Sequence, residues 1–359
     1  MGLRVECCNE YELEAKFRSF YEKLAKMTNR RYNVKTGKQG NLMSVPFRKL
    51  RVADFLLSGG PCTPWANNGP RTGRKHPAAR VTERLIKIVS RLAKRGRLLG
   101  FALENTNNIL KKINGEPAFI EFVMDRFKSI PFFAISVDTI NVNDTCASVR
   151  RRTWVRGLRG DVLAALNLHR VPPPLHSLAG KPIKLTEVLR RDLPNVNPAT
   201  MKVKKGRNIL KLIRAIKRDA RQGVAGRIAV IDADRSPDNV WGTTVMYDLM
   251  PPLRASGPEY FIVSVRDITM PWFARDFCRF LSDEERMEIQ GHSADKASMM
   301  PTNSMRKRSA GNAFPVQMVA QALLPMMTAI AKSGAFKKRR LALSASAQQK
   351  LSADMCNAE

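Results

Sequence analysis

The 359 residues suffice for one large domain or two ordinary ones, and 44% of them are hydrophobic, so the chain can bury a sizeable core. Lys and Arg number 62 against 31 Asp and Glu, which gives a formal net charge of +31. This charge destabilises a compact chain unless a polyanion neutralises it, so we expect a nucleic-acid partner. The long apolar segments exclude a purely structural, histone-like role.

The cysteines and histidines indicate neither a metal site nor a disulfide framework. None of the six cysteines forms a C-x-x-C pair, and the four histidines stand singly. The N-terminus lacks the apolar core of a signal peptide, and the apolar stretch 316–331 is too short and too interrupted to span a bilayer. We expect free thiols, no membrane partner, and a protein that is not secreted, nuclear in a eukaryotic host and otherwise cytoplasmic or nucleoid.

Strands and helices are predicted to alternate along the first 160 residues. In chain order we expect a strand Leu3–Cys8, a helix Asn9–Lys26, a basic connector 28–39, a strand 51–57, a helix Val81–Arg95, a strand Leu98–Leu103, a helix Ala118–Lys128, an extended segment Phe132–Val142 and a strand Thr153–Val155. This alternation predicts an α/β fold with a doubly wound, mostly parallel sheet.

The pattern changes near Gly160. Proline clusters and short mixed segments run to about Met270, and regular periodicity resumes at Arg279. One amphipathic helix interrupts them, with Ile209, Leu212, Ile213 and Ile216 on its apolar side and Lys211, Arg214, Lys217 and Arg218 opposite. This helix is either an ordinary solvated helix or a phosphate-contacting surface. The stretch 316–331 is predicted to be a core helix.

The first chemical motif is Ser58-Gly-Gly-Pro-Cys62, directly after a predicted strand. Ligands of α/β sheets bind beyond the carboxyl ends of the strands. Pro61 fixes the backbone before the thiol, and Gly59 and Gly60 leave room for a ligand to approach the main chain. A lone cysteine is more often an inert buried residue, so the motif gains meaning only with partners.

Four further segments follow in order. They are Glu104-Asn105 at the next strand end, Ser148-Val-Arg-Arg-Arg152 before a strand, Arg279-Phe-Leu-Ser-Asp-Glu-Glu285 with Gln290-Gly291, and Gly311-Asn-Ala-Phe-Pro315. Singly, each also fits an ordinary role such as a solvated acid, a basic turn or a helix cap. Together they resemble the cytosine-C5 DNA methyltransferase family, over roughly residues 1–160 and 275–330.

The resemblance implies a DNA (cytosine-5-)-methyltransferase in which the Cys62 thiolate adds to C6 of cytosine and so activates C5. Glu104 would protonate N3, while Arg150 and Arg152 would orient the ring. The cytosine would be flipped out of the duplex. Further substrate contacts are assigned to Asn105, Ser148 and Gly291, although Ser148 replaces the family's Gln.

The implied cofactor is S-adenosyl-L-methionine, with binding residues Glu6, Asn41, Pro61 and Asn312. Glu6, or Glu10 with a small shift, would bind the ribose hydroxyls. Asn41 stands where the family has Asp near adenine, and its side chain can still accept from the adenine amino group. The family's first strand and its Phe-x-Gly-x-Gly loop have no counterpart, so we expect an N-terminally truncated chain that lacks this strand.

The expected architecture is a Rossmann-like methyltransferase sheet with a smaller second domain. We predict a catalytic core over 1–159, a variable target-recognition domain over 160–272, a C-terminal part of the core over 273–333 and a disordered basic tail over 334–359. Double-stranded DNA is the expected partner. Two alternatives stay open: an RNA substrate, because one branch of the family methylates tRNA, and a catalytically impaired DNA-binding accessory homologue.

Overall fold

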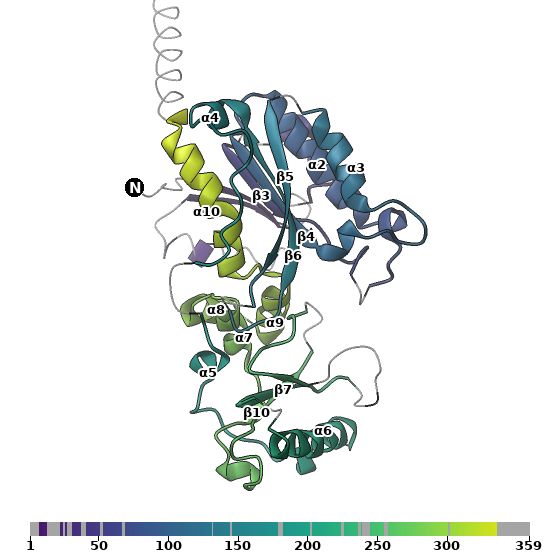
Figure 1. Ribbon diagram of the computed structural model, residues 1–359, viewed down its shortest axis with the longest axis vertical. Helices are drawn as coiled ribbons and strands as arrows, with labels where there is room; N and C mark the ends of the chain where they lie inside the picture. Colours follow the sequence, from purple (N-terminus) through teal and green to yellow (C-terminus); the bar gives the residue numbers. More distant parts are fainter. Residues whose placement is uncertain are drawn as a thin grey trace, which may run out of the picture.

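A computed structural model describes residues 7–12, 22, 23, 26, 31–36, 41–50, 53–66, 69–130, 132–143, 146–178, 182–201, 203–223, 226–235, 238, 245–254, 258–300 and 302–335. Two sheet-containing units are visible in Figure 1, and we call them the α/β unit and the second unit.

The α/β unit is formed by the first part of the chain. Its elements are β1 (Cys7–Glu12), β2 (Arg31–Thr36), η3 (Phe47–Lys49), β3 (Phe55–Gly59), η4 (Gly73–Lys75), α2 (Ala79–Lys94), β4 (Gly100–Thr106), η5 (Asn107–Leu110), α3 (Phe119–Lys128), β5 (Phe133–Asn141), β6 (Arg151–Arg159) and α4 (Gly160–Ala164). The alternation of strands and helices confirms the predicted α/β class.

The main sheet of this unit has the strand order β3-β4-β6-β5. Strands β3, β4 and β5 run in the same direction, which confirms the prediction of a mostly parallel sheet, but β6 is antiparallel to both of its neighbours. The reason is the length of the connection 142–150, which suits an antiparallel return, whereas a parallel crossover needs a dozen or more residues.

The N-terminal predictions need correction. The first described strand is β1, so the helix predicted from Asn9 cannot begin there, while residues 3–6 of the predicted strand lie outside the described residues. The segment predicted as a connector contains β2, which pairs with β1 in parallel. Within the described residues, β1 and β2 form a two-stranded sheet that is separate from the main one.

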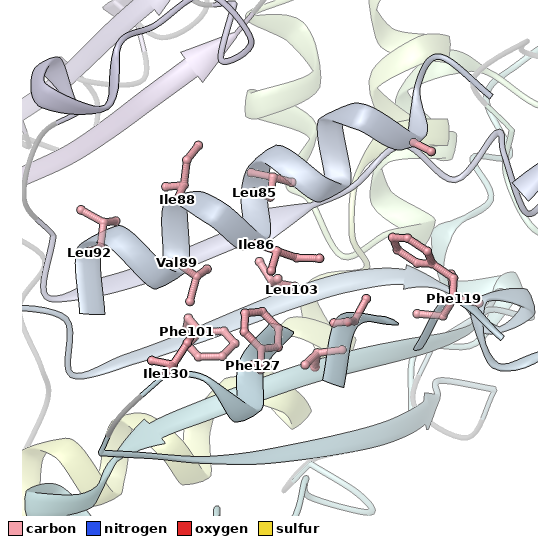
Figure 2. Packing of buried hydrophobic residues seen from close by; sticks show 14 of the residues in the cluster. Leu85, Ile86, Ile88, Val89, Leu92, Phe101, Leu103, Phe119, Phe127 and Ile130 are labelled. Carbon is pink, nitrogen blue, oxygen red and sulfur yellow. The ribbon is translucent and has the colours of Figure 1, made fainter. Parts of the chain in front are cut away.

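Helices α2 and α3 cover one face of the main sheet. The apolar positions of α2 recur at helical spacing as Leu85, Ile88, Val89 and Leu92, which are buried in one core. Figure 2 shows Val89 on the side of α2 that faces Phe101 of β4. Each buried side chain of this size contributes about 1.5–3 kcal/mol to stability. The side chains of β4 alternate between the two faces of the sheet: Phe101 and Leu103 point toward the helices, while Ala102 points to the opposite face.

Helix α10 (Val316–Lys332) covers that opposite face, as Figure 1 shows. Its buried residues Met318, Ala322 and Met326 pack with Ala102 and Leu158 of the sheet, which confirms the predicted core helix. Within the described part of the chain no single helix could cross a membrane. Of the described helices, only α9 (Asn303–Asn312) and α10 taken together, as a pair bent by 43°, have the length and apolar composition of a membrane span.

The second unit is built on a sheet of order β10-β9-β7-β8, in which every pairing is antiparallel. Its elements are α5 (Leu185–Val188), η6 (Pro198–Thr200), α6 (Val203–Arg221), β7 (Ile228–Asp232), β8 (Val245–Tyr247), β9 (Tyr260–Ser264), η7 (Trp272–Ala274), β10 (Cys278–Phe280), α7 (Asp283–Ile289), α8 (Ala294–Ser298) and α9 (Asn303–Asn312). Helix α6 is the predicted basic amphipathic helix.

The packing groups residues 277–310 with the second unit rather than with the α/β unit. Strand β10 pairs with β9, and the buried residues of α7 and α9 share one core with β7 and β9. Arg279 and Glu285 form a buried ion pair of 2.6 Å that ties β10 to α7. Among the described elements after residue 272, α10 packs on the main sheet.

Candidate active site at the strand ends

The loop that carries Cys62 leaves the main sheet next to Glu104. Gly59 at the end of β3 lies opposite Glu104 on β4, and the Gly60 N–H donates to the Glu104 carbonyl at 3.1 Å. Three residues span at most about 10 Å, so Cys62 lies near this carboxyl group. The thiol is free and exposed.

A turn fixes the backbone around Cys62. The Cys62 carbonyl accepts the N–H groups of Trp65 at 3.0 Å and Ala66 at 2.8 Å. The Trp65 ring is buried against Phe119, and the Trp65 carbonyl accepts from the Asn108 side chain at 2.8 Å. The thiol is therefore presented to solvent from an anchored loop.

Glu104 is a buried carboxyl group, exposed by only 6%. Strand alternation points it to the face covered by α10, because it has the same parity as Ala102. Its Oε1 lies 2.8 Å from Nε of Arg152. Burial raises the pKa of Glu104 above its ordinary value, although Arg152 and Arg150 oppose this rise. The environment therefore favours the protonated, proton-donating form more than water does.

Arg150 and Arg152 reach the same edge because β6 runs antiparallel to β4. The start of β6 lies beside the end of β4, where Arg152 pairs with Thr106. Arg150 is 3% exposed, and its Nη1 donates to the Gly311 carbonyl at 3.5 Å. Burial lowers the pKa of Arg150 to about 10, and the positive Arg152 adds to this, while the charges of Glu104 and Cys62 oppose it. Arg150 stays cationic at neutral pH.

Cys62, Glu104, Arg150 and Arg152 thus converge on one edge of the main sheet, which is where the sequence predicted a reactive site. The charges of Cys62 and Glu104 both act on Arg150, and Arg152 is in direct ion-pair contact with Glu104. The group combines a nucleophile, an acid and two cations within one small region.

Phe314 is a site residue that the sequence reasoning named only as part of a motif. A Cβ atom added to Gly59 would lie 2.6 Å from Phe314 Cζ and 3.5 Å from Glu104 Oε2. The ring also packs on buried Trp154, with centroids 5.7 Å apart. The sequence contains both Gly59 and Phe314, but only the fold shows that the end of β3 and the α9–α10 turn lie against each other.

Two of the predicted substrate contacts lie away from this edge or are enclosed. Asn105 points to the α2 side of the sheet, where its buried Nδ2 lies near Gly60 and has no hydrogen-bond partner among the described residues. Ser148 is fully buried, and the described part of the chain offers its Oγ no partner. Neighbouring backbone atoms dock on Met250: Val149 N–H donates to it at 2.9 Å.

Gly291 ends α7 with a φ of +80°, a backbone geometry that favours glycine. A Cβ atom there would lie 2.8 Å from the Gln317 amide. The preceding carbonyl, of Gln290, accepts from Val316 N–H at 2.8 Å and so joins α7 to α10. Gly291 therefore shapes the junction of these helices, and its contact with substrate stays a prediction.

The four predicted cofactor residues come from four segments of the chain. Glu6 lies outside the described residues, immediately before β1. Ligands of doubly wound sheets bind beyond the carboxyl ends of strands, and β1 ends at Glu12, so the alternative residue Glu10 lies nearer to that end. Pro61 is half-buried beside Cys62, and Asn312 is exposed at the end of α9.

Asn41 keeps hydrogen-bonding capacity on its side chain. Its Oδ1 accepts the Met43 N–H at 3.0 Å, which leaves a lone pair and the NH2 group for a ligand. Arg84 of α2 fixes this segment by donating to the carbonyls of Leu42 at 3.3 Å and Val45 at 2.5 Å. Among the described residues no three His, Cys, Asp or Glu side chains are placed to hold a metal ion.

Solved structures share this fold at low sequence identity. A putative DNA modification methyltransferase encoded within an E. coli prophage superposes with a TM-score of 0.54 at 13% identity, covering 92% of this chain and 93% of that one. A mutant of the Spodoptera frugiperda protein DNMT2 gives 0.53 at 14% identity, with coverages of 90% and 92%. The Entamoeba histolytica methyltransferase EhMeth gives 0.51 at 14%, with coverages of 91% and 99%.

No curated protein sequence matches this chain. The model of the C-5 cytosine-specific DNA methylase family matches residues 2–326, which is nearly the whole sequence. The match spans the Cys62 loop, the Glu104 strand end and the arginine segment. The chain therefore belongs to the C-5 cytosine-specific DNA methylase family.

Proposed function

We propose that this protein transfers a methyl group from S-adenosylmethionine, the methyl donor of its family, to C5 of cytosine in DNA through a covalent Cys62 adduct. The observation that carries the proposal is the convergence of Cys62, Glu104, Arg150 and Arg152 on one edge of the main sheet. The DNA substrate is supported by the family description, and the net charge of +31 favours a nucleic-acid partner, whether DNA or RNA.

Cys62 supplies the nucleophile. Its thiolate forms an Sγ–C6 bond with the cytosine ring, the 5,6 double bond is lost, and C5 becomes electron-rich enough to take up a methyl group. The cytosine must leave the base stack to present C6 to the thiol, so the proposal includes base flipping. A solvent base then takes the C5 proton, the 5,6 double bond re-forms as the Sγ–C6 bond breaks and the Cys62 thiolate leaves, and N3 returns its proton to Glu104.

Glu104 and the arginines manage the charge that this addition creates. Protonated Glu104 donates to ring N3, and its raised pKa keeps that proton available closer to neutral pH. Arg152 holds the carboxyl group in place through its ion pair, and buried Arg150 offers a fixed positive charge beside the ring.

Asn41, Pro61 and Asn312 are the described residues that would hold S-adenosylmethionine. When bound, this cofactor supplies an electrophilic methyl group on a sulfonium centre. Asn41 would engage adenine, in a segment that Arg84 fixes against α2. Pro61 would place the methyl donor beside the thiol-bearing loop.

A methyl-transfer assay tests the proposal and its substrate. The purified chain is incubated with radiolabelled S-adenosylmethionine and either duplex DNA or tRNA, with Cys62→Ala as the control. We expect label in the DNA only, and none with the control. Label in tRNA alone would make the protein an RNA cytosine methyltransferase. Tight DNA binding without transfer to either substrate would favour an accessory, non-catalytic role.

A further inference from the structure

Helix α6 carries a row of basic side chains on its solvent face. Arg207, Lys211, Arg214, Arg218 and Arg221 follow one another at steps of four and three residues, and all five are exposed. These steps keep the side chains on one face of a helix, and the row is about 21 Å long. We call these five residues the α6 basic row.

The opposite face of α6 fixes this orientation. Ile209, Leu212, Ile213 and Ile216 are buried in the core that α6 shares with β7 and β9. The one acidic residue of the helix, Asp219, accepts a hydrogen bond from the Tyr247 hydroxyl at 2.9 Å. The helix therefore cannot rotate about its axis to bury its basic side chains. Its single acidic residue does little to neutralise their charge.

The acidic contacts of the row are weak. Lys211 and Asp238 form an ion pair of 2.6 Å whose side chains are 58% and 74% exposed, and Arg218 lies 3.8 Å from Asp219. Exposed pairs of this kind contribute about 0–1 kcal/mol, so phosphate oxygens can replace them. In the described part of the chain no carboxylate lies within ion-pair distance of Arg214 or Arg221.

The row faces away from the catalytic edge. Alternating residues of β7 face opposite sides of its sheet: Ala229 and Ile231 pack on α6, while Ile228 and Val230 pack with α7 and α9. The sheet and these helices thus separate α6 from the α/β unit, and Figure 1 shows α6 at the far end of the second unit. A nucleic acid that touches the row is not held there by Cys62 or Glu104.

We propose that the α6 basic row is a second nucleic-acid contact, which binds the phosphate backbone outside the segment that enters the catalytic edge. It rests on the proposed function for its partner class. About 21 Å of row matches about six phosphates of one DNA strand, and guanidinium groups pair with phosphate oxygens in a bidentate manner. Such contacts carry no sequence information but raise affinity and fix orientation.

The test measures binding of a duplex made only of A·T pairs, which offers no cytosine. Affinity is followed by fluorescence anisotropy over a series of salt concentrations for the full chain and for the triple variant Arg214→Gln, Arg218→Gln, Arg221→Gln. Each lost phosphate contact lowers the slope of log K against log salt by about 0.9, so we expect a loss of about 2.7. Raising the salt concentration from roughly 50 to 200 mM should therefore weaken DNA binding by the variant about 40-fold less than it weakens binding by the unmodified chain.

The matched control is Lys87→Gln, Arg91→Gln, Lys94→Gln, which removes the same charge from an exposed row on α2. We expect its slope to equal that of the unmodified chain, and circular dichroism to show that both variants are folded. An unchanged slope in the α6 variant, or an equal fall in the control, overturns the inference. Because the probe lacks cytosine, these outcomes are independent of whether the protein methylates DNA.

Discussion

At the scale of single residues, the proposed site depends on a carboxyl group that is buried away from water. Glu104 is buried and its pKa is raised by desolvation, while two arginines limit that rise. An acid of this kind keeps its proton at a higher pH than a solvated glutamate does. Glu104 can therefore protonate a ring nitrogen under conditions in which a surface acid is ionised.

Glu104→Gln should lower the rate of methyl transfer by about 10²–10⁴-fold, because an amide cannot deliver a proton. The unmodified enzyme needs protonated Glu104, so its rate should fall as the pH rises through the raised pKa. The variant should lack this fall. Single-turnover rates over a pH series measure both effects.

Glu121→Gln is the control for this variant, since it removes an exposed carboxyl group from α3. Its rate and pH profile should match those of the unmodified chain. If Glu104→Gln keeps full activity with the same pH profile, Glu104 is not the acid.

At the scale of elements, the end of β3 and the α9–α10 turn fit closely together. Gly59 admits the Phe314 ring, which rests on Trp154 and borders Glu104. The turn also supplies the Gly311 carbonyl to Arg150. The α9–α10 turn therefore contacts the side chains of Glu104 on β4 and Arg150 before β6, to which we assign catalytic roles.

Gly59→Ala should displace the Phe314 ring, because the new Cβ would lie 2.6 Å from Cζ. Overpacking of this kind costs about 1–3 kcal/mol of unfolding free energy. Adding Phe314→Leu should recover part of that cost, and thermal unfolding of both single variants and the double variant measures the coupling. Strictly additive costs would show that the two residues do not meet.

The β10–α7 connection makes a second prediction at this scale. Glu285 accepts two bonds from Arg279, at 2.6 and 2.9 Å, and also caps the start of α7 with Ser282. Glu285→Gln leaves the Arg279 charge buried without its partner, which costs about 3–5 kcal/mol. Calorimetric unfolding checks this, with Asp125→Asn in the exposed pair with Lys128 as the control, expected to cost under about 1 kcal/mol. Equal small shifts in both variants would contradict the prediction.

The sequence predicted the elements better than their pairing. Cys62 and Glu104 were placed together because each follows an apolar strand, and the carboxyl ends of neighbouring parallel strands meet. Arg150 lies at the same edge because β6 is antiparallel to β4, and apolar periodicity does not encode strand direction. Apolar periodicity could not locate β1, because its sequence, CCNEYE, shows no alternation of apolar and polar residues.

At the scale of the whole molecule, the catalytic edge lies where the two units meet. Arg150 bonds to Gly311 of α9, and the preceding segment docks on Met250 of the second unit. In Figure 1 the end of β4 and the start of β6 lie on the side of α9. A nucleic acid held between the units would thus present its cytosine to Cys62 from the side of the second unit.

The most direct test of this account uses a duplex that contains 5-fluorocytosine, together with S-adenosylmethionine. The fluorine at C5 blocks the proton removal that frees the enzyme, so a covalent complex should accumulate and peptide mapping should locate it on Cys62. Cys62→Ala should give none. If the complex forms on another residue, survives in Cys62→Ala, or never forms while the DNA is methylated, the central claim is wrong.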